Sequence, residues 1–129
     1  MTPRTLTLSV LPEILAVCRL GPGEPIPDWA LIASSFLSLT RTTDELSVVC
    51  SESSVPDDIR CERDWRALKV DGPLDLAETG ILASLTTPLG DAGISVFAVS
   101  TFDTDYLLVK QPALDRTRSV LTRAGHRFV

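Results

Sequence analysis

The stretch from residue 78 to residue 110 constrains the fold more than any other part of the chain; it reads ETGILASLTTPLGDAGISVFAVSTFDTDYLLVK. In its first part, four apolar residues recur at helical spacing and predict a helix with one buried face: Ile81, Leu82, Leu85 and Leu89. Gly93 follows this pattern and is typical of a helix C-cap. The apolar run 94–99 predicts a buried strand, and residues 106–109 predict a second strand beyond a turn. A helix followed by a hairpin is half of a βαββαβ unit.

The rest of the C-terminal half supplies the remaining elements of that unit. The pattern predicts strands over 63–71, 94–100, 105–110 and 126–129, and helices over 76–92 and 113–124. This order predicts an α+β, ferredoxin-like fold, an antiparallel sheet with both helices on one face. The strand over 94–99 is apolar on both of its faces, so we expect the free face of the sheet to be covered by the N-terminal half or by a second subunit.

The N-terminal half is predicted to be rich in strands, with little room for helices. Strands are expected over 6–10, 14–20, 36–40 and 46–50, with a turn at 11–13 and one short helical turn at Trp29, which we expect to be a core residue. The acidic segment 51–58 reads as a boundary. We therefore predict two ferredoxin-like units side by side, residues 1–57 and 58–129, the first with shortened helices.

Composition narrows the classes of partner. Hydrophobic residues make up 44% of the 129 residues and charged residues 22%, as in globular proteins. The net charge of −5 gives no basic footprint for nucleic acid. Apolar runs fall far short of the roughly 20 residues that a membrane span needs, and the N-terminal sequence lacks a signal-peptide pattern. We therefore expect a cytoplasmic protein without nucleic-acid or membrane partners.

The residues that most often carry chemistry are few in this chain. Cys18, Cys50 and Cys61 are odd in number and lack metal-ligand spacing, so we expect them to be structural core residues. The only histidine, His126, lies four residues from the C-terminus and is expected at the surface or a strand edge. Asp103 and Asp105 are a carboxylate pair without a histidine or a phosphate-binding loop nearby. We therefore expect no metal, no cofactor and no enzyme activity.

Two motifs and two glycines carry a resemblance to a known family. A βαββαβ unit with Gly80 near the start of its first helix and Gly93 after that helix resembles an ACT domain. The segments FLSLTRT (36–42), with Asp44 and Glu45 after it, and STFDTDYLLVK (100–110) resemble the paired ACT repeats of three groups of proteins. These groups are the cytosolic arginine sensors of the TOR growth pathway, small bacterial proteins of the same subfamily and the regulatory regions of aspartate kinases.

The resemblance implies a regulatory protein, because ACT units of this kind pair side by side and bind amino acids at the interface between units. The chain carries one such pair and no catalytic domain. The expected function is therefore that of an amino-acid-binding sensor, and the expected partners are a free amino acid and a second copy in a homodimer. Two alternatives stay open: a ligand-free structural dimerisation or protein-interaction module, and a regulatory subunit of a separate enzyme or transporter.

A binding site can also be argued from the residues themselves. A helix that starts near Glu78 leaves the backbone N–H groups of Thr79, Gly80 and Ile81 without helical partners, and these can take a carboxylate. Gly80 leaves room for a close approach. An ammonium group needs a fixed carboxylate, which Asp103 or Asp105 can supply, while Thr101 and Phe102 offer backbone groups and an apolar wall. The alternative is purely structural: a favourable first-turn charge, turn residues and a packing glycine.

Overall fold

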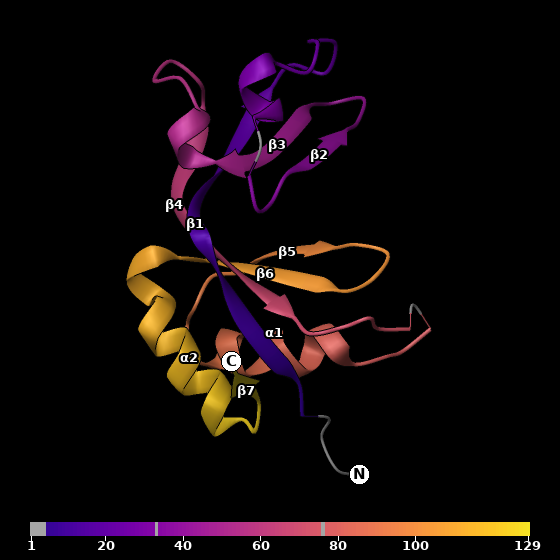
Figure 1. The fold of residues 1–129 in the computed structure, drawn as a ribbon, viewed down its shortest axis with the longest axis vertical. Helices are drawn as coiled ribbons and strands as arrows, with labels where there is room; N and C mark the ends of the chain where they lie inside the picture. The colour runs from indigo at the N-terminus through magenta and orange to yellow at the C-terminus, as the bar shows by residue number, and fades with distance from the viewer. Residues whose placement is uncertain (1–4, 33, 76) are drawn as a thin grey trace. The chain divides into compact units, whose positions relative to one another are not determined.

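The structure is a computed structural model that describes residues 5–32, 34–75 and 77–129 (Figure 1). The chain divides into two compact units: unit 1 comprises Met1–Leu11 and Ala67–Val129, and unit 2 comprises Pro12–Arg66. Two long strands, β1 (Thr7–Leu20) and β4 (Cys61–Val70), contribute residues to both units. The predicted boundary between residues 57 and 58 was drawn from the repeated order of strands and helices, whereas these two units are defined by compactness. The predicted boundary therefore stays a prediction.

Unit 2 has the βαββαβ element order with a 3-10 helix in the place of each α-helix. Between the ends of β1 and β4 the chain forms η1 (Asp28–Leu31), β2 (Ser38–Arg41), β3 (Leu46–Ser51) and η2 (Glu52–Ser54). The strands are hydrogen-bonded in the order β2-β3-β1-β4. The prediction of shortened helices in the first half is confirmed. Proline and glycine dominate the segment 21–27 and leave too little chain for a full helix before β2.

Unit 1 has the same element order with full-length helices. After β4 come α1 (Ile81–Asp91), β5 (Phe97–Ser100), β6 (Asp105–Lys110), the 3-10 helix η3 (Gln111–Ala113), α2 (Leu114–Arg123) and β7 (Arg127–Phe128). The strand order is β7-β1-β4-β6-β5, with β1 and β7 parallel and β5 and β6 antiparallel. Both helices lie on one side of these strands (Figure 1). The α+β, ferredoxin-like class is thus confirmed.

Both helices of unit 1 end in the same glycine-dependent motif. At the end of α1, Gly93 has a φ of 74°, and the N–H of Ile94 donates to the carbonyl of Leu89 at 2.9 Å. At the end of α2, Gly125 has a φ of 102°, and the N–H of His126 donates to the carbonyl of Leu121 at 3.0 Å. These are Schellman bonds, which satisfy carbonyls that the helix leaves open. The predicted helix stop at Gly93 is therefore confirmed.

Each unit has its own hydrophobic core. In unit 1, one face of the strands packs against α1 and α2 through fully buried leucines and valines: Leu8, Leu68, Val70, Leu85, Leu89, Leu107, Val109 and Leu121. In unit 2 the core is made of smaller side chains: Ala16, Cys18, Ala30, Leu46, Val48, Cys50 and Val55. Trp29 packs against this second core and is partly buried, as predicted.

Three local predictions were wrong in position or extent. The two strands expected over 6–10 and 14–20 are one strand, β1. Pro12 does not break it, because it lies between the residues that pair with β7 and those that pair with β3, where its backbone can stay extended. The helix expected from residue 76, which itself lies outside the described residues, begins only at Ile81. The strand expected from 94 begins at Phe97, and Ile94 instead packs into the unit 1 core.

The prediction that His126 lies at the surface or a strand edge was also wrong, because only 4% of this residue is exposed. The backbone N–H of Leu6 donates to Nδ1 at 3.1 Å, and Nε2 lies 3.0 Å from the carbonyl oxygen of Ser84. A carbonyl only accepts, so Nε2 carries the proton and Nδ1 carries none. The imidazole therefore joins the start of β1 to α1. A single histidine in a sequence shows nothing of the backbone groups that it satisfies.

Candidate functional site

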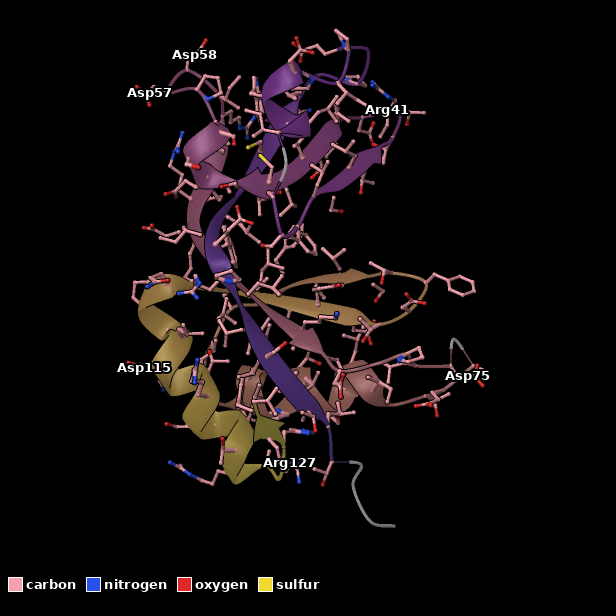
Figure 2. The ribbon with its side chains drawn as sticks, viewed as in Figure 1. Arg41, Asp57, Asp58, Asp75, Asp115 and Arg127 are labelled. Atoms are coloured by element: carbon pink, nitrogen blue, oxygen red, sulfur yellow. The ribbon has the colours of Figure 1, made fainter. Side chains whose placement is uncertain are left out.

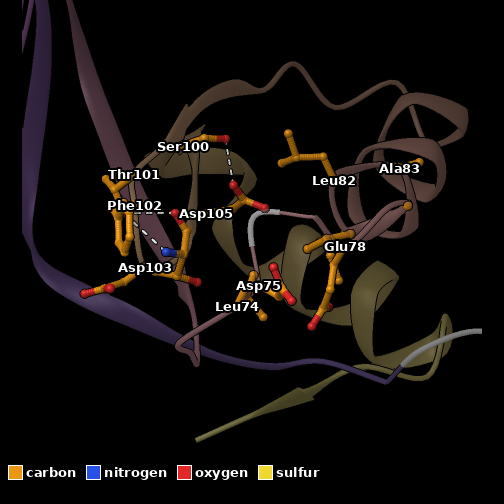
Figure 3. Close-up of a pocket in the computed structure, with 13 residues that line it drawn as sticks. Leu74, Asp75, Glu78, Leu82, Ala83, Ser100, Thr101, Phe102, Asp103 and Asp105 are labelled. Carbon is orange, nitrogen blue, oxygen red and sulfur yellow. Dashed lines mark hydrogen bonds between the residues drawn. The ribbon is translucent and has the colours of Figure 1, made fainter.

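A cavity of about 360 Å³ lies in unit 1 between the start of α1 and the turn that joins β5 to β6 (Figure 3). Seven of the eight residues predicted for the binding site line it: Glu78, Gly80, Ile81, Thr101, Phe102, Asp103 and Asp105. Thr79 is exposed and is not among the lining residues. The structure therefore brings the two predicted halves of the site together, and the binding of a ligand there stays a prediction.

The helix start differs from the one expected. Gly80 is the N-cap of α1, with a φ of 79° in the left-handed region, and no side chain caps the helix. The backbone donors at the cavity are consequently those of the first turn, from Ile81 to Ala83, and not those of Thr79 to Ile81. A Cβ built at position 80 would meet no atom within 4 Å, so a lack of space does not require the glycine. Its left-handed backbone conformation does, because residues with a side chain rarely adopt it.

The opposite wall is a turn built around Thr101. Its N–H donates to the carbonyl of Thr104 at 2.8 Å, and its hydroxyl lies 3.0 Å from the same carbonyl and 3.3 Å from the Thr104 N–H. The Thr104 hydroxyl is buried and donates to the carbonyl of Val70 at 2.6 Å, which ties the turn to β4. Phe102 lies at the tip of this turn and is 79% exposed. The wall is thus a hydrogen-bonded turn with an exposed aromatic ring.

The segment before α1 closes the floor of the cavity against this turn. The N–H of Leu74 donates to the carbonyl of Asp103 at 2.6 Å. Gly72 permits the approach, because a Cβ at that position would lie 3.0 Å from the same carbonyl oxygen and 3.2 Å from the Cβ of Thr104. A larger residue at position 72 would push the two walls apart.

Four carboxylates line the cavity: Asp75, Glu78, Asp103 and Asp105. The hydroxyl of Ser100 donates to Oδ1 of Asp105 at 2.6 Å, and Oδ1 of Asp75 accepts the N–H of Ala77 at 2.9 Å. Figure 3 shows Asp75, Glu78 and Asp105 on the side of the cavity, whereas the carboxylate of Asp103 points away from them. No lysine or arginine is among the described residues that line the cavity. The site is strongly acidic apart from the helix start.

Sequence reasoning missed Leu74, Asp75, Leu82, Ala83, Ser100 and Thr104, which also line the cavity. Leu82 and Ala83 follow directly once the helix start moves from residue 78 to residue 81. Ser100 could have been found, since it and Asp105 flank a four-residue turn and must face each other across the hairpin. Asp75 comes from an irregular segment, seen in Figure 2, whose path no periodic pattern predicts.

Two kinds of feature are absent from the residues that the structure describes. No group of three or more histidine, cysteine, aspartate or glutamate side chains in the described ranges is arranged to hold a metal ion. In the same residues, no helix has the length and apolar character needed to cross a membrane.

Comparison with known proteins assigns a family to the C-terminal half of the chain. A family model described as ACT domain matches residues 60–123, and a second model, described as an N-terminal domain, matches residues 13–58. A protein from Agobacterium tumefaciens solved by X-ray crystallography is 41% identical and has a TM-score of 0.92, over 98% of this chain and 94% of that one. The C-terminal half of the chain belongs to the ACT domain family.

Two further relatives show how far the similarity extends. The human cytosolic arginine sensor for mTORC1 subunit 1 is 38% identical over 60 residues, which are 46% of this chain and 18% of that protein. This chain therefore matches less than a fifth of the curated relative. The regulatory subunit of aspartate kinase from Thermus flavus has a TM-score of 0.65 over 94% of this chain and 99% of that one. Its identity is 8%, so that likeness concerns the fold alone.

Proposed function

We propose that this protein is a regulatory sensor that binds a free amino acid in the cavity of unit 1. One observation carries the proposal: an uncapped helix start and a group of carboxylates line the same cavity of about 360 Å³. This volume is within the range of pockets that hold small ligands. A free amino acid has one anionic and one cationic end, and the cavity offers a partner for each.

The two ends of the ligand are assigned by charge. The carboxylate goes to the N–H groups of the first turn of α1, where the helix dipole also favours an anion. The ammonium goes to Asp105, whose carboxylate is held by the Ser100 hydroxyl and needs little ordering when the ligand binds. Asp103, the other predicted partner of the ammonium, points outward and has the weaker claim. Thr101 and Phe102 close the side of the site.

The surplus of carboxylates favours an amino acid with a basic side chain. One ammonium group neutralises Asp105 and leaves the carboxylate of Asp75 facing the same space. A guanidinium group offers donors in a planar fork that suits carboxylates, so arginine is our first candidate and lysine our second. The name of the curated relative, an arginine sensor, supports the same choice, although the match covers only part of that protein.

The remaining parts of the proposal concern context. We place the protein in the cytoplasm as a homodimer that acts on a separate target, as the name of the cytosolic relative and the regulatory-subunit fold suggest. We assign it no catalytic step, because the described cavity residues offer carboxylates and hydroxyls without a histidine, cysteine or lysine beside them. Light scattering at tens of micromolar tests the dimer independently of the ligand.

Calorimetric titration with four matched ligands tests the site. Arginine should bind in this titration. In a separate thermal-shift measurement it should raise the melting temperature by mass action. Citrulline has the shape of arginine without the side-chain charge, and agmatine lacks the carboxylate. Each should bind roughly ten- to a hundredfold more weakly, the effect of losing one charge-assisted hydrogen bond. Lysine should fall between arginine and citrulline.

Each result separates one alternative. Equal binding of arginine and citrulline would contradict a basic side chain as the specificity determinant. Equal binding of arginine and agmatine would contradict the helix start as the carboxylate site. If none of the twenty amino acids binds at millimolar concentration, the protein is a structural dimerisation module or acts as a regulatory subunit without its own ligand.

A further inference from the structure

Unit 2 gathers the three cysteines of the chain on one side of its strands. Cys18 lies on β1, Cys50 on β3 and Cys61 at the start of β4, and all three are free thiols that belong to or pack against the same core. Cys18 and Cys50 are buried, whereas Cys61 is partly exposed. The sequence separations of 32 and 11 residues gave no sign of this, because the three come together only through strand pairing.

Cys18 and Cys61 face each other directly across β1 and β4. These strands are neighbours in the sheet, and the N–H of Arg19 donates to the carbonyl of Arg60 at 3.0 Å. In an antiparallel ladder this bond flanks a non-hydrogen-bonded pair made by the residue before Arg19 and the residue after Arg60, which are Cys18 and Cys61. The Cα atoms of such a pair are about 4.5 Å apart, within the range that a disulfide spans.

Cys50 has a different relation to Cys18. The partner of Cys18 on β3 is Val48, and Cys50 is paired with Ala16, so Cys18 and Cys50 are diagonal neighbours. Diagonal positions are about 7–8 Å apart, too far for a disulfide without movement of the backbone. The thiol of Cys18 is hydrogen-bonded to Cys50 and, more weakly, to Cys61. The bond to Cys50, burial and the neighbouring thiols raise the pKa of Cys18, and the bond from Cys18 lowers the pKa of Cys50. The register thus singles out one pair of the three.

We propose that Cys18 and Cys61 are a reversible oxidation site, which forms a cross-strand disulfide when the protein meets a hydroperoxide. The partly exposed Cys61 is the thiol that the oxidant reaches, and the buried Cys18 opposite resolves the product. This site is independent of the amino-acid cavity, since all three thiols lie in unit 2 and the cavity is lined by residues of unit 1.

The chemistry balances with hydrogen peroxide as the oxidant. The Cys61 thiolate attacks one peroxide oxygen, the O–O bond breaks, and water leaves once the second oxygen takes up a proton, which gives a sulfenic acid. The Cys18 sulfur then attacks the sulfenic sulfur. The S–O bond breaks, the Cys18 proton goes to the leaving hydroxyl, and a second water departs. Two thiols supply two electrons to the peroxide, and a dithiol such as dithiothreitol reverses the reaction.

The expected consequence is a stiffer unit 2. The bond would close a loop that contains η1, β2, β3 and η2 and would restrict the unfolded chain. The oxidised protein should therefore melt roughly 5–10 °C above the reduced protein. The strand register already places the two thiols opposite each other, so little of this gain should be lost to strain.

The test is oxidation of the whole purified chain with hydrogen peroxide, followed by thiol counting in denaturant and mapping of linked peptides. The wild-type protein should fall from three free thiols to one, with a Cys18–Cys61 link that dithiothreitol reverses. Cys50→Ser should still lose two thiols and form the same link. Cys61→Ser is the matched control and should form no intramolecular link.

Several results would overturn the proposal. One is retention of all three thiols under peroxide conditions that oxidise a free dithiol of the same concentration. Others are a link mapped to Cys50, a disulfide between two chains through Cys61, and oxidation that dithiothreitol cannot reverse. A lower melting temperature of the oxidised form would show that the native register does not accommodate the bond. Amino-acid binding should be equal in both redox states, which keeps this test separate from that of the proposed function.

Discussion

The β2–β3 hairpin of unit 2 and the β5–β6 hairpin of unit 1 are built alike around the same threonine turn. Thr42 donates its N–H to the carbonyl of Glu45 at 2.9 Å, just as Thr101 donates to Thr104 at 2.8 Å. In each turn the threonine hydroxyl also accepts the backbone N–H of the residue three positions on, at 3.2 Å and 3.3 Å. The two hairpins therefore have one backbone plan, and their differences lie in the side chains beside the turn.

The residues that flank the turn differ between the two hairpins. In unit 1 the flanking pair is Ser100 and Asp105, and in unit 2 it is Arg41 and Leu46. Leu46 is 1% exposed and belongs to the core, so the position that carries the proposed ammonium partner in unit 1 is apolar in unit 2. Arg41 donates to the carbonyls of Pro22 and Glu24, which holds a loop where unit 1 has a helix.

The proposed site of unit 1 combines a carboxylate beside the hairpin turn with the start of an α-helix. Within the described residues 12–32 and 34–66 the helices are 3-10 helices of four and three residues, and these lack the aligned donors of a longer helix. The described residues of unit 2 keep the fold without an α-helix start, and Leu46 stands where unit 1 has Asp105, although Asp44 and Glu45 lie in the turn itself. The two units thus separate what the fold requires from what the proposed ligand requires.

The largest effect is expected when Leu46 of unit 2 is replaced by aspartate, the residue at the corresponding position of unit 1. Leu46→Asp places a carboxylate in the core of unit 2 without a partner, and we expect a loss of about 3–5 kcal/mol in the free energy of unfolding. Urea denaturation measures it. Leu46→Met nearly preserves volume and should cost less than about 1.5 kcal/mol. Equal stability of Leu46→Asp and the parent would mean that position 46 tolerates a charge as position 105 does.

The corresponding change in unit 1 removes a charge and keeps the shape. Asp105→Asn should weaken binding of the amino acid by about 1.5–3 kcal/mol, the worth of a hydrogen bond to a charged group, and leave stability nearly unchanged. This is roughly ten- to a hundredfold in Kd, measured by calorimetry. Asp103→Asn is the control, because its carboxylate points away from the cavity, and it should bind nearly as the parent does. If both variants lost the same binding free energy, the loss would come from the lower negative charge of the protein and not from a contact with Asp105.

A substitution at Gly80 is a poorer test than the sequence suggests. From the sequence alone, Gly80→Val would block the approach to the helix start and leave the fold intact. With a φ of 79°, a β-branched residue at this position strains the backbone, so lost binding would be confounded with lost stability. Gly80→Asn, which tolerates the left-handed region, is the variant that separates the two effects.

The sequence predicted much of unit 1 because its signals are local. Helical spacing, glycine stops and the hairpin turn each act within about ten residues, and the helix start was misplaced only because no capping side chain marks it. What could not be predicted depends on pairing at long range. The merging of two strands into β1, the approach of Asp75 to the cavity and the Cys18–Cys61 opposition all depend on which strands become neighbours.

His126 offers a test of such a long-range contact, and it has no equivalent in unit 2. His126→Phe keeps a buried ring but leaves the Leu6 N–H and the Ser84 carbonyl without their partner. We expect a loss of about 1–3 kcal/mol in the free energy of unfolding, the cost of unsatisfied buried backbone groups. Arg123→Ala, an exposed change three residues earlier, should be nearly neutral. A neutral His126→Phe would show that water or a shift of α1 satisfies both groups.

The smallest expected effect comes from replacing the turn threonines, and it tests most directly whether the two hairpins are equally stable. Thr42→Val and Thr101→Val each remove a hydroxyl that bonds the backbone within its own turn, so each should cost about 0.5–1.5 kcal/mol by urea denaturation. The two losses should agree, because the same bonds are removed from the same kind of turn. Thr101→Val should also change amino-acid binding little, since its hydroxyl is already bonded to the Thr104 carbonyl. A much larger stability loss at Thr101 would mean that the turn in unit 1 is held by the cavity around it, and that the hairpins share a shape without sharing their energetics.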